Sequence, residues 1–360
     1  MNTIHGAKAT VSLAALRDNF SKIKQLAPNS RCLAIVKANG YGHGMLAVAQ
    51  ALREQADGFG VAHLKEAAAL RRHGIDNPIV LLEGFFNTND VPYLQEYNLE
   101  PVLHSDYQLR AIEQTALCGR LKVWIKIDTG MHRLGFACDE VQAVYARLQA
   151  SGKVESIGFV SHFSRADERE CDYSQTQIDR FEQAIGDLPG PRSLSASNGI
   201  LFWPQAHYDA VRPGIILYGI APDDDIRTTQ SRGLRCAMTL KSNIIALRRH
   251  KAGEPVGYGG RWVSPRESNI AVVAMGYGDG FPRDVPENTP VLINGKRYPI
   301  VGKVSMDMLT VDLGDDSAAI GDDVTFWGPD LPVEEIAQHL GVISYELVTQ
   351  LSSRVSREYI

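Results

Sequence analysis

The segment RCLAIVKANGYGHG, residues 31–44, joins a short apolar run to a single lysine and a glycine-rich turn. Residues 32–36 are continuously apolar, Lys37 follows directly, and glycines stand at positions 40, 42 and 44. A short apolar run bounded by glycine is typical of a buried β-strand. The amine of Lys37 is therefore predicted to lie at the end of a buried strand, where a low dielectric makes an amine easier to deprotonate. A lysine at a strand end is most often a solvated charge, so its role depends on what surrounds it.

Seven further apolar runs follow at intervals that indicate alternating strands and helices. They span residues 58–62, 78–82, 101–103, 123–127, 157–160, 193–197 and 211–218. Amphipathic stretches with helical spacing lie between several of them, for example at residues 64–70 and 141–148. Strands that alternate with helices form a parallel sheet, and eight such repeats predict an α/β fold of the (β/α)8 TIM-type barrel class. An open doubly wound sheet is the alternative, because run 101–103 is short and run 193–197 is polar.

The pattern changes after a polar segment at residues 221–233. Six apolar runs then predict a mostly antiparallel β domain, and they span 237–247, 270–275, 290–293, 300–304, 309–313 and 324–327. Asn294-Gly295 between two of these runs is a strong hairpin signal. Residues 331–340 and 344–351 predict closing helices, and residues 7–13 predict an edge strand. The predicted domains are a barrel at 1–230 and a mostly β C-terminal domain at 231–360.

Composition excludes several classes of protein. A net charge of −5 argues against a basic nucleic-acid-binding surface, and no apolar run is long enough to span a membrane. The first eight residues, MNTIHGAK, contain no apolar core of a signal peptide. Five widely spaced cysteines without a Cys-x-x-Cys motif favour a reducing, cytoplasmic location. No clustered histidines or carboxylates suggest a metal site, so we expect none.

Polar side chains follow the predicted barrel strands, where barrel enzymes carry their active sites. Lys37 follows the first run; Lys126, Asp128 and Arg133 lie at the end of the fifth, His162 at that of the sixth and Ser197 at that of the seventh. Arg212 stands where the eighth run opens. The hydroxyl of Ser197 and the backbone N–H groups after it can bind a phosphate, and such sites are frequent after strands seven and eight. The residues alone thus favour a barrel enzyme with a phosphorylated ligand. Taken singly, His162 is more often a core histidine and Arg212 a surface arginine.

These residues lie in motifs that resemble the alanine racemase family, whose members use pyridoxal 5′-phosphate. AIVKANGYGHG at 34–44 is similar to the motif that carries the family's cofactor lysine. Further signatures occur in the family's order, and they are DTGMHRLG at 128–135, RPGIILYG at 212–219, GYGDG at 276–280, GKVSMD at 302–307 and SYE at 344–346. The resemblance covers nearly the whole chain. It implies a barrel followed by a β domain, with the first strand, at about 1–12, joining the C-terminal domain.

The resemblance also implies an activity, the interconversion of L-alanine and D-alanine by two bases. Lys37 is expected to hold the cofactor as an internal aldimine and to act as one base. Tyr277, from the other subunit of a head-to-tail homodimer, is expected to be the second base. Arg212 is expected to face the pyridine nitrogen, and His162 to contact both Tyr277 and Arg212.

Further roles follow from the same motifs. The phosphate is expected to meet Tyr41, Ser197, Tyr345 and the backbone N–H groups of Gly214 and Ile215. Arg133 is expected to support the phenolic oxygen of the cofactor and, with the backbone of the partner subunit's Met306, to bind the substrate carboxylate. Lys126 matches a lysine that is carbamylated in many members of the family.

Other functions remain compatible with a barrel of this type. The enzymatic alternatives are a racemase of broad specificity and a decarboxylase, although a decarboxylase is expected to lack the tyrosine of the 276–280 motif. The alternative that is not an enzyme is a cofactor-carrier protein, but such chains resemble a barrel alone. The sequence leaves open whether the activity supplies D-alanine for peptidoglycan or feeds alanine catabolism.

Overall fold

The computed structural model describes residues 6–360, so the first five residues of the expected N-terminal strand lie outside the described part. The chain divides into two compact units. The first, here called the barrel unit, comprises residues 17–40 and 45–217. The second, the β-rich unit, comprises the residues up to 16, residues 41–44 and residues 218–360. The expected domain boundary between residues 230 and 231 stays a prediction, because compactness alone does not define a domain.

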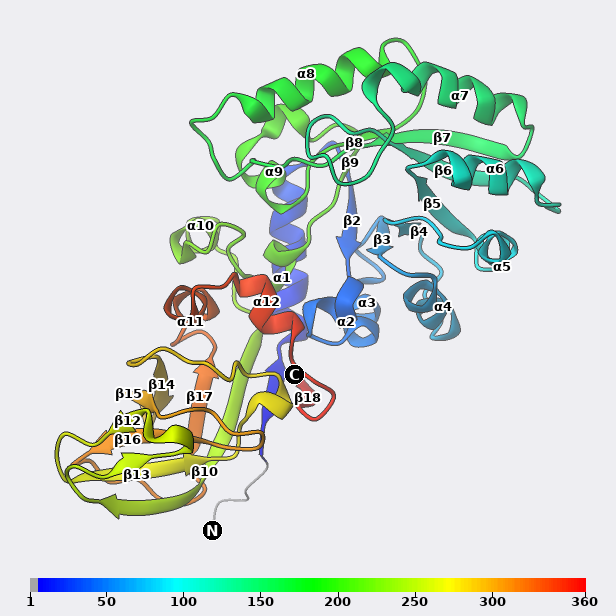
Figure 1. Cartoon of the computed structure of the whole chain (residues 1–360). Helices are drawn as coiled ribbons and strands as arrows, with labels where there is room; N and C mark the ends of the chain where they lie inside the picture. Colours follow the sequence, from blue (N-terminus) through cyan, green and yellow to red (C-terminus); the bar gives the residue numbers. More distant parts are fainter. Residues whose placement is uncertain (1–5) are drawn as a thin grey trace. The chain divides into compact units, whose positions relative to one another are not determined.

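The barrel unit contains one parallel sheet of eight strands (Figure 1). The strands are β2 (Arg31–Ile35), β3 (Gly58–Val61), β4 (Ile79–Leu81), β5 (Leu99–Leu103), β6 (Leu121–Lys126), β7 (Val154–Val160), β8 (Arg192–Ser193) and β9 (Ala210–Val211). Each strand pairs with the next in the chain from β2 to β8, and β9 returns to pair with β2. The two ends of this order meet, since Ala196 forms a parallel bridge with Arg212 and Asp209 N donates to Arg192 O at 3.1 Å. The barrel is therefore confirmed, because a doubly wound sheet would reverse its order at a switch point.

Helices follow most of these strands, and Figure 1 shows α4 to α8 in sequence beside the sheet. They are α3 (Met45–Leu52), α4 (Leu64–Arg72), α5 (Val91–Glu96), α6 (Asp106–Gln114), α7 (Val141–Ala150), α8 (Tyr173–Ile185) and α9 (Ser197–Phe202), and α1 (Leu13–Leu26) precedes β2. A cluster of buried residues draws one side chain from each of six strands, namely Leu33, Val80, Val102, Trp124, Val160 and Ala210. Apolar side chains that meet in this way fill a barrel interior and make it a packed core. None of the helices that the structure describes is both long and apolar enough to cross a bilayer.

Two predicted barrel strands are shorter than expected. The run at 193–197 forms a strand only up to Ser193, because the hydroxyls of Ser193 and Ser195 donate to the carbonyls of Ala210 and Ala206 at 2.7 and 2.8 Å. The run at 211–218 forms a strand only at its first residue. Pro213 then removes a donor, and the 3₁₀ turn η4 (Ile215–Tyr218) follows.

The β-rich unit is built around a second sheet of eight strands. Its strands lie in the order β13 (Ser268–Val273), β16 (Leu309–Gly314), β15 (Lys296–Val301), β14 (Pro290–Ile293), β17 (Asp323–Trp327), β10 (Met238–His250), β1 (Lys8–Val11) and β18 (Ser356–Tyr359). Short elements complete it, namely β11 (Pro255–Val256), β12 (Trp262–Val263), α10 (Ile226–Gln230), α11 (Val333–Leu340), α12 (Ser344–Thr349) and the 3₁₀ turns η5 (Tyr258–Gly260) and η6 (Tyr277–Asp279). The hairpin expected at Asn294-Gly295 is present. Ile293 pairs with Lys296, and both loop residues have positive φ, as a type I′ turn requires.

The expectation of an edge strand at 7–13 was wrong. Strand β1 lies inside the sheet, antiparallel to β10 and parallel to β18. The edge is β18, whose polar sequence SREY lacks the apolar alternation by which strands are predicted. The N-terminal strand therefore belongs to the β-rich unit because the last residues of the chain cover it.

We predict that Gly42→Ala destabilises the protein far more than Gly74→Ala. Both glycines have a left-handed backbone, with φ of +79° and +75°. A Cβ at Gly42 would lie 1.8 Å from the carbonyl oxygen of Val348, whereas nothing lies within 4 Å of a Cβ at Gly74. The strain of the backbone, about 1–2 kcal/mol, is common to both variants. Displacing the Val348 carbonyl adds about 1–3 kcal/mol to the first alone.

Urea unfolding of the two variants and the wild type measures this difference. Equal shifts of the unfolding midpoint in the two variants would contradict the predicted overlap.

Candidate active site

Lys37 leads into a left-handed turn of the backbone. Strand β2 ends at Ile35, two residues earlier, and the residues after Lys37 have φ of +50° at Ala38, +54° at Asn39, +62° at Gly40 and +50° at Tyr41. An L-residue in this conformation costs about 1–2 kcal/mol, so the three non-glycine residues of this four-residue stretch store strain. Such strain persists only where surrounding contacts enforce it, and it is concentrated at functional sites.

Side-chain hydrogen bonds hold this turn in the barrel unit. The backbone N–H of Ala38 donates to the Glu66 carboxylate at 2.8 Å, and that of Met45 donates to Asn39 Oδ1 at 3.0 Å. Glu66 is itself fixed at the start of α4, where it also accepts from the backbone N–H of His63 at 3.1 Å. The direction in which the chain leaves Lys37 is therefore set by a carboxylate from the next βα unit.

Cationic side chains gather around Lys37 at the strand ends of the barrel unit. Burial lowers the pKa of the Lys37 amine; Glu83 and Glu66 oppose this shift, and Arg133 and Arg212 add to it. Burial lowers the pKa of Lys126, the last residue of β6, well below its ordinary value, and Arg212 and Arg133 lower it further. Amines that lose their protons easily are nucleophiles and bases near neutral pH. The cluster thus combines two reactive amines with two guanidinium groups.

Arg212 is the anchor of this cluster. It is 6% exposed, and its guanidinium donates to Ser193 Oγ at 2.6 Å, to the Ser161 and Leu194 carbonyls at 2.7 and 3.2 Å, and to His162 Nδ1 at 3.3 Å. Burial lowers the pKa of Arg212 to about 10, so the group still keeps its proton at neutral pH. A buried positive charge with fixed direction therefore lies at the ends of β7, β8 and β9.

His162 is held in a defined neutral form. Burial lowers the pKa of His162 well below its ordinary value, and Lys126, Arg212, Arg133 and Lys37 all act in the same direction. Arginine has no acceptor, so Nδ1 of His162 accepts the hydrogen bond from Arg212, and the ring hydrogen is on Nε2. The imidazole can thus donate through Nε2 to a partner while it stays uncharged.

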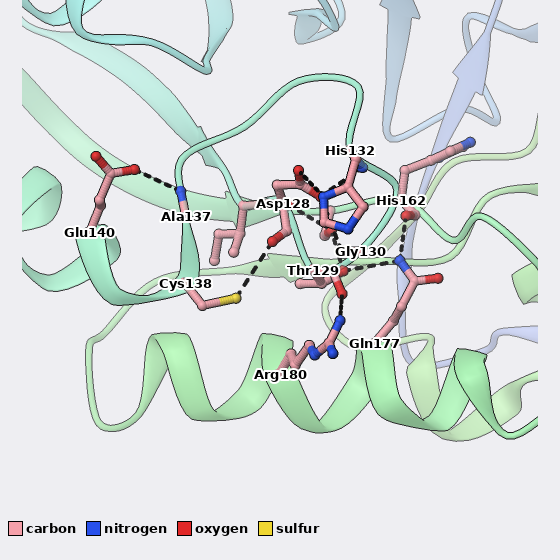
Figure 2. Close-up of polar contacts among 12 residues, drawn as sticks. Asp128, Thr129, Gly130, His132, Ala137, Cys138, Glu140, His162, Gln177 and Arg180 are labelled. Atoms are coloured by element: carbon pink, nitrogen blue, oxygen red, sulfur yellow. Dashed lines mark hydrogen bonds and ion pairs between the residues drawn. The ribbon is translucent and has the colours of Figure 1, made fainter.

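The loop that carries Arg133 follows β6 and is organised by Asp128 (Figure 2). Its carboxylate accepts from the backbone N–H groups of Gly130 and His132, both at 3.0 Å, and lies 3.1 Å from His132 Nδ1. Burial alone raises the pKa of Asp128, but the hydrogen bonds from His132 and Gly130 outweigh it and lower the pKa. The loop therefore turns around an ionised carboxylate just before Arg133.

The predicted phosphate-binding groups of the barrel unit are also close together. Helix α9 begins at Ser197, and the Ser197 hydroxyl accepts from the backbone N–H of Gly214 at 3.1 Å. Ile215, the next residue, is fully buried and begins η4. The Gly214 N–H thus holds the Ser197 oxygen in place, and the hydroxyl hydrogen is left to donate, which is suitable chemistry for a phosphate oxygen.

The remaining predicted site residues belong to the β-rich unit. The rings of Tyr41 and Tyr345 lie 6.1 Å apart, and burial raises the pKa of Tyr41, which keeps its hydroxyl a donor. Tyr277 is 40% exposed and Met306 is 52% exposed. Their loops are joined, because Tyr277 N donates to Ser305 O at 3.1 Å and Gly278 N donates to Met306 O at 2.9 Å.

Sequence reasoning missed two polar residues that support the site. Glu66 fixes the turn after Lys37, and the available signal was its place three residues after His63, the N-cap of α4. Gln177, on α8, donates to Thr129 Oγ1 at 3.2 Å and to the His162 carbonyl at 3.1 Å (Figure 2). Its signal was a large polar residue on the buried face of α8 that also carries Ile178 and Phe181.

The low pKa of His162 predicts a stability that falls in acid. The unfolded chain protonates this histidine below about pH 6.5, whereas the folded state resists protonation, so stability is full above that pH and decreases below it. His162→Gln should remove this contribution. Its loss of unfolding free energy between about pH 7.5 and 5.5 should be smaller than that of the wild type by about 1.4 kcal/mol.

Chemical denaturation at the two pH values tests this expectation, with His73→Gln as the control because His73 is an exposed histidine. The control should lose as much stability as the wild type. An identical loss in the His162 variant would show that His162 is protonated equally well in the folded and unfolded states.

Comparison with known proteins places these features in a family. Residues 11–222 match the family of alanine racemase N-terminal domains, and residues 237–359 match that of alanine racemase C-terminal domains. The alanine racemase of Haemophilus influenzae is 56% identical over 356 residues, which cover 98% of each chain. That of Edwardsiella ictaluri is 52% identical over 357 residues, again covering 98% of each chain.

Solved structures agree with the sequence matches. The biosynthetic alanine racemase from Pseudomonas aeruginosa superposes with a TM-score of 0.95 at 42% identity, covering 99% of this chain and all of the other. The alanine racemase from Bartonella henselae, solved with covalently bound pyridoxal phosphate, superposes with a TM-score of 0.91 at 31% identity and the same coverage. With the eight-stranded barrel and both family matches in agreement, this chain belongs to the alanine racemase family.

Proposed function

We propose that this chain catalyses the interconversion of L-alanine and D-alanine with pyridoxal 5′-phosphate as its cofactor. The observation that carries the proposal is the Lys37 amine, whose pKa is lowered by burial and by Arg133 and Arg212 at the strand ends of the barrel unit. A readily deprotonated amine near two arginine side chains fits a cofactor that carries an aldehyde and a phosphate. The relatives in which the whole chain finds its match are alanine racemases.

The donors of this chain fit each part of that cofactor. Lys37 is proposed to hold it covalently. The phosphate is assigned to hydroxyls and backbone N–H groups, those of Tyr41, Ser197, Gly214, Ile215 and Tyr345. When bound, the cofactor withdraws electrons from the α-carbon of the amino acid and so makes its proton easier to remove.

Arg212 and Arg133 are proposed to set the direction of the chemistry. Arg212 would donate to the pyridine nitrogen of a bound cofactor, and because the guanidinium keeps its proton this nitrogen would stay unprotonated. The electron-withdrawing character of the cofactor would then be moderate, which would disfavour side reactions such as transamination. Arg133 would support the phenolic oxygen and bind the substrate carboxylate, together with the backbone of the partner's Met306.

Racemisation needs a proton to leave one face of the α-carbon and another to arrive on the opposite face. We propose Lys37 as the base on one face and the partner's Tyr277 as the base on the other, in a homodimer with shared active sites. The exposed side chains of Tyr277 and Met306 support this arrangement, since both are available to a second chain. His162 is proposed to donate from Nε2 to that tyrosine, consistent with a ring hydrogen on Nε2.

Lys126 is proposed to carry a carbamate. Its pKa lies well below the ordinary value, so a neutral amine is available to attack carbon dioxide. The new N–C bond forms with loss of one proton, and the product is an anion. An anion is favoured there because Arg212 and Arg133, which repel the protonated amine, attract the carbamate. It would also orient Arg133.

A cytoplasmic location is part of the proposal. All five cysteines are free, and five thiols without a disulfide are ordinary in a reducing compartment. D-alanine supply for peptidoglycan and alanine catabolism would both use the residues described above.

Lys37→Ala should abolish racemisation and remove the visible absorbance of protein-bound cofactor, because the covalent link and one base are lost together. Tyr277→Phe should keep the absorbance and lose activity, since only the second base is removed. Spectra of the purified variants and a polarimetric assay across several L-amino acids measure both effects. Lys65→Ala, at an exposed lysine on α4, is the control and should match the wild type.

Mixing the two inactive variants tests whether the sites are shared. A mixed dimer should contain one complete site, with Lys37 from one chain and Tyr277 from the other, so activity should return. A mixture that forms dimers but stays inactive would refute the shared site. An active Lys37→Ala variant would refute the role of Lys37 as cofactor lysine and base, and equal rates on many amino acids would favour a racemase of broad specificity.

The carbamate predicts a mass change at Lys126. Native mass spectrometry of the intact protein should show the added mass of one carbon dioxide. Acid should remove this addition, and bicarbonate should restore it. Lys126→Gln should lack it and should have lower activity, because Arg133 loses its anionic partner. A wild-type mass without the addition, at saturating bicarbonate, would contradict the proposal.

A further inference from the structure

Gln177 is a fully buried amide in which every hydrogen-bonding position is used. It lies on α8 and is 0% exposed. Its Nε2 donates to Thr129 Oγ1 at 3.2 Å and to the His162 carbonyl at 3.1 Å. Its Oε1 accepts from the backbone N–H of Ser164 at 3.0 Å and from the Ser164 hydroxyl at 3.1 Å. Two donors and two acceptors are the full capacity of a glutamine side chain.

The chemistry of the partners fixes the direction in which this amide points. The His162 carbonyl can only accept, so it must face the NH₂ group. The backbone N–H of Ser164 can only donate, so it must face the oxygen. A flipped amide would place its oxygen against the His162 carbonyl and its NH₂ group against the Ser164 N–H, and the glutamine therefore has one orientation.

A directed chain of hydrogen bonds continues from Gln177 into the barrel. The Ser161 hydroxyl donates to the Ile127 carbonyl at 2.7 Å, so its oxygen can only accept from Thr129 Oγ1 at 2.9 Å. Thr129 thereby uses its hydrogen, and its oxygen is left to accept from Gln177. The chain runs from α8 through the loop after β6 to the end of β7, and its residues are buried.

Helix α8 forms hydrogen bonds with the same loop at two further points. Tyr173 donates through its hydroxyl to the Gly130 carbonyl at 2.9 Å, and Arg180 donates to the Thr129 carbonyl at 3.2 Å. Figure 2 shows Arg180 and Gln177 rising from one helix toward Thr129. Gln177 differs from both, because it also binds the loop after β7 through His162 and Ser164.

We propose that Gln177 is a positioning residue that holds the Arg133 loop and the His162 loop in one fixed relation. Its single amide joins Thr129, four residues before Arg133, to the backbone of His162 itself. The proposal rests on the roles assigned above to Arg133 and His162, and it adds a group that touches neither substrate nor cofactor. Misplacement of reacting groups by about 1 Å can cost about a hundredfold in rate, so the loss of this link should lower kcat.

Two substitutions at Gln177 separate the effect of its hydrogen bonds from that of its side-chain volume. Gln177→Leu keeps the bulk and loses all four hydrogen bonds, so kcat should fall about tenfold or more at every pH. Gln177→Glu keeps an acceptor for Ser164, but its ionised form cannot donate to the His162 carbonyl. A buried carboxyl has a raised pKa. As the pH falls, the protonated glutamate regains a donor, and the ratio of its kcat to that of the wild type should rise. The corresponding ratio for Gln177→Leu should stay flat.

Hydrogen exchange of the cofactor-free protein gives a readout that does not depend on activity. Residues 127–136 and 161–164 should exchange faster in Gln177→Leu than in the wild type. Gln175→Leu and Gln175→Glu, at an exposed glutamine two residues away on α8, are the matched controls and should leave exchange and the pH profile unchanged. If neither Gln177 variant folds, Thr129→Val decides. It keeps the shape and breaks the chain, so it should reproduce the loss of kcat and the faster exchange, and Thr129→Ser should restore both.

A pH-independent kcat ratio for Gln177→Glu, together with unchanged exchange in Gln177→Leu, would overturn the proposal. So would a Thr129→Val variant with wild-type kcat and exchange. Failure of the proposed function is a different result, namely a wild-type protein that racemises no alanine. Hydrogen exchange would still decide the positioning role in that case.

Discussion

The buried positive charge of Arg212 is the constraint on which the rest of the site depends. It is surrounded by carbonyl and hydroxyl oxygens from the ends of β7 and β8, and these compensate its desolvation. Burial is the main cause that lowers the pKa values of His162 and Lys126, and the positive charge of Arg212 lowers both further. The lowered pKa values of the two amines thus follow from burial together with an arginine that does no proton transfer itself.

Strain at Lys37 is the second consequence of building the site at strand ends. Four successive residues with left-handed backbone follow the lysine, three of them not glycine, and the Glu66 carboxylate from the next βα unit enforces the turn. With a right-handed backbone at these residues, the chain would leave Lys37 in another direction. The energy stored here is small compared with the burial of the barrel interior, so the fold can maintain it.

The sequence pattern predicted the strands and motifs that depend on neighbouring residues in the chain. The alternation of apolar runs located six of the eight barrel strands closely, and the glycine motifs pointed to Lys37 and Tyr277. Prediction from the apolar pattern failed where the structure of a segment depends on the strand that pairs with it. Strand β18 has no apolar alternation and is a strand because β1 lies beside it. Strands β8 and β9 end early because serine hydroxyls and Pro213 interrupt the ladder. The role of Gln177 was equally hidden, since its meaning lies in four bonds to two distant loops.

The two kinds of support in the site have different physical origins, and this explains why only one is visible in motifs. Groups that touch a ligand need a particular chemistry, so they occur as recognisable residue types at fixed spacings around Lys37 or Arg212. Residues that position the ligand-binding groups need only to form hydrogen bonds with every buried donor and acceptor around them. Several residue types on different elements could do so. Gln177 is a residue of this kind, because the two donors and two acceptor positions of its amide match the groups that the two loops present to it. A buried polar side chain with complete hydrogen bonding to two functional loops is therefore a structural signal for positioning residues where sequence motifs provide none.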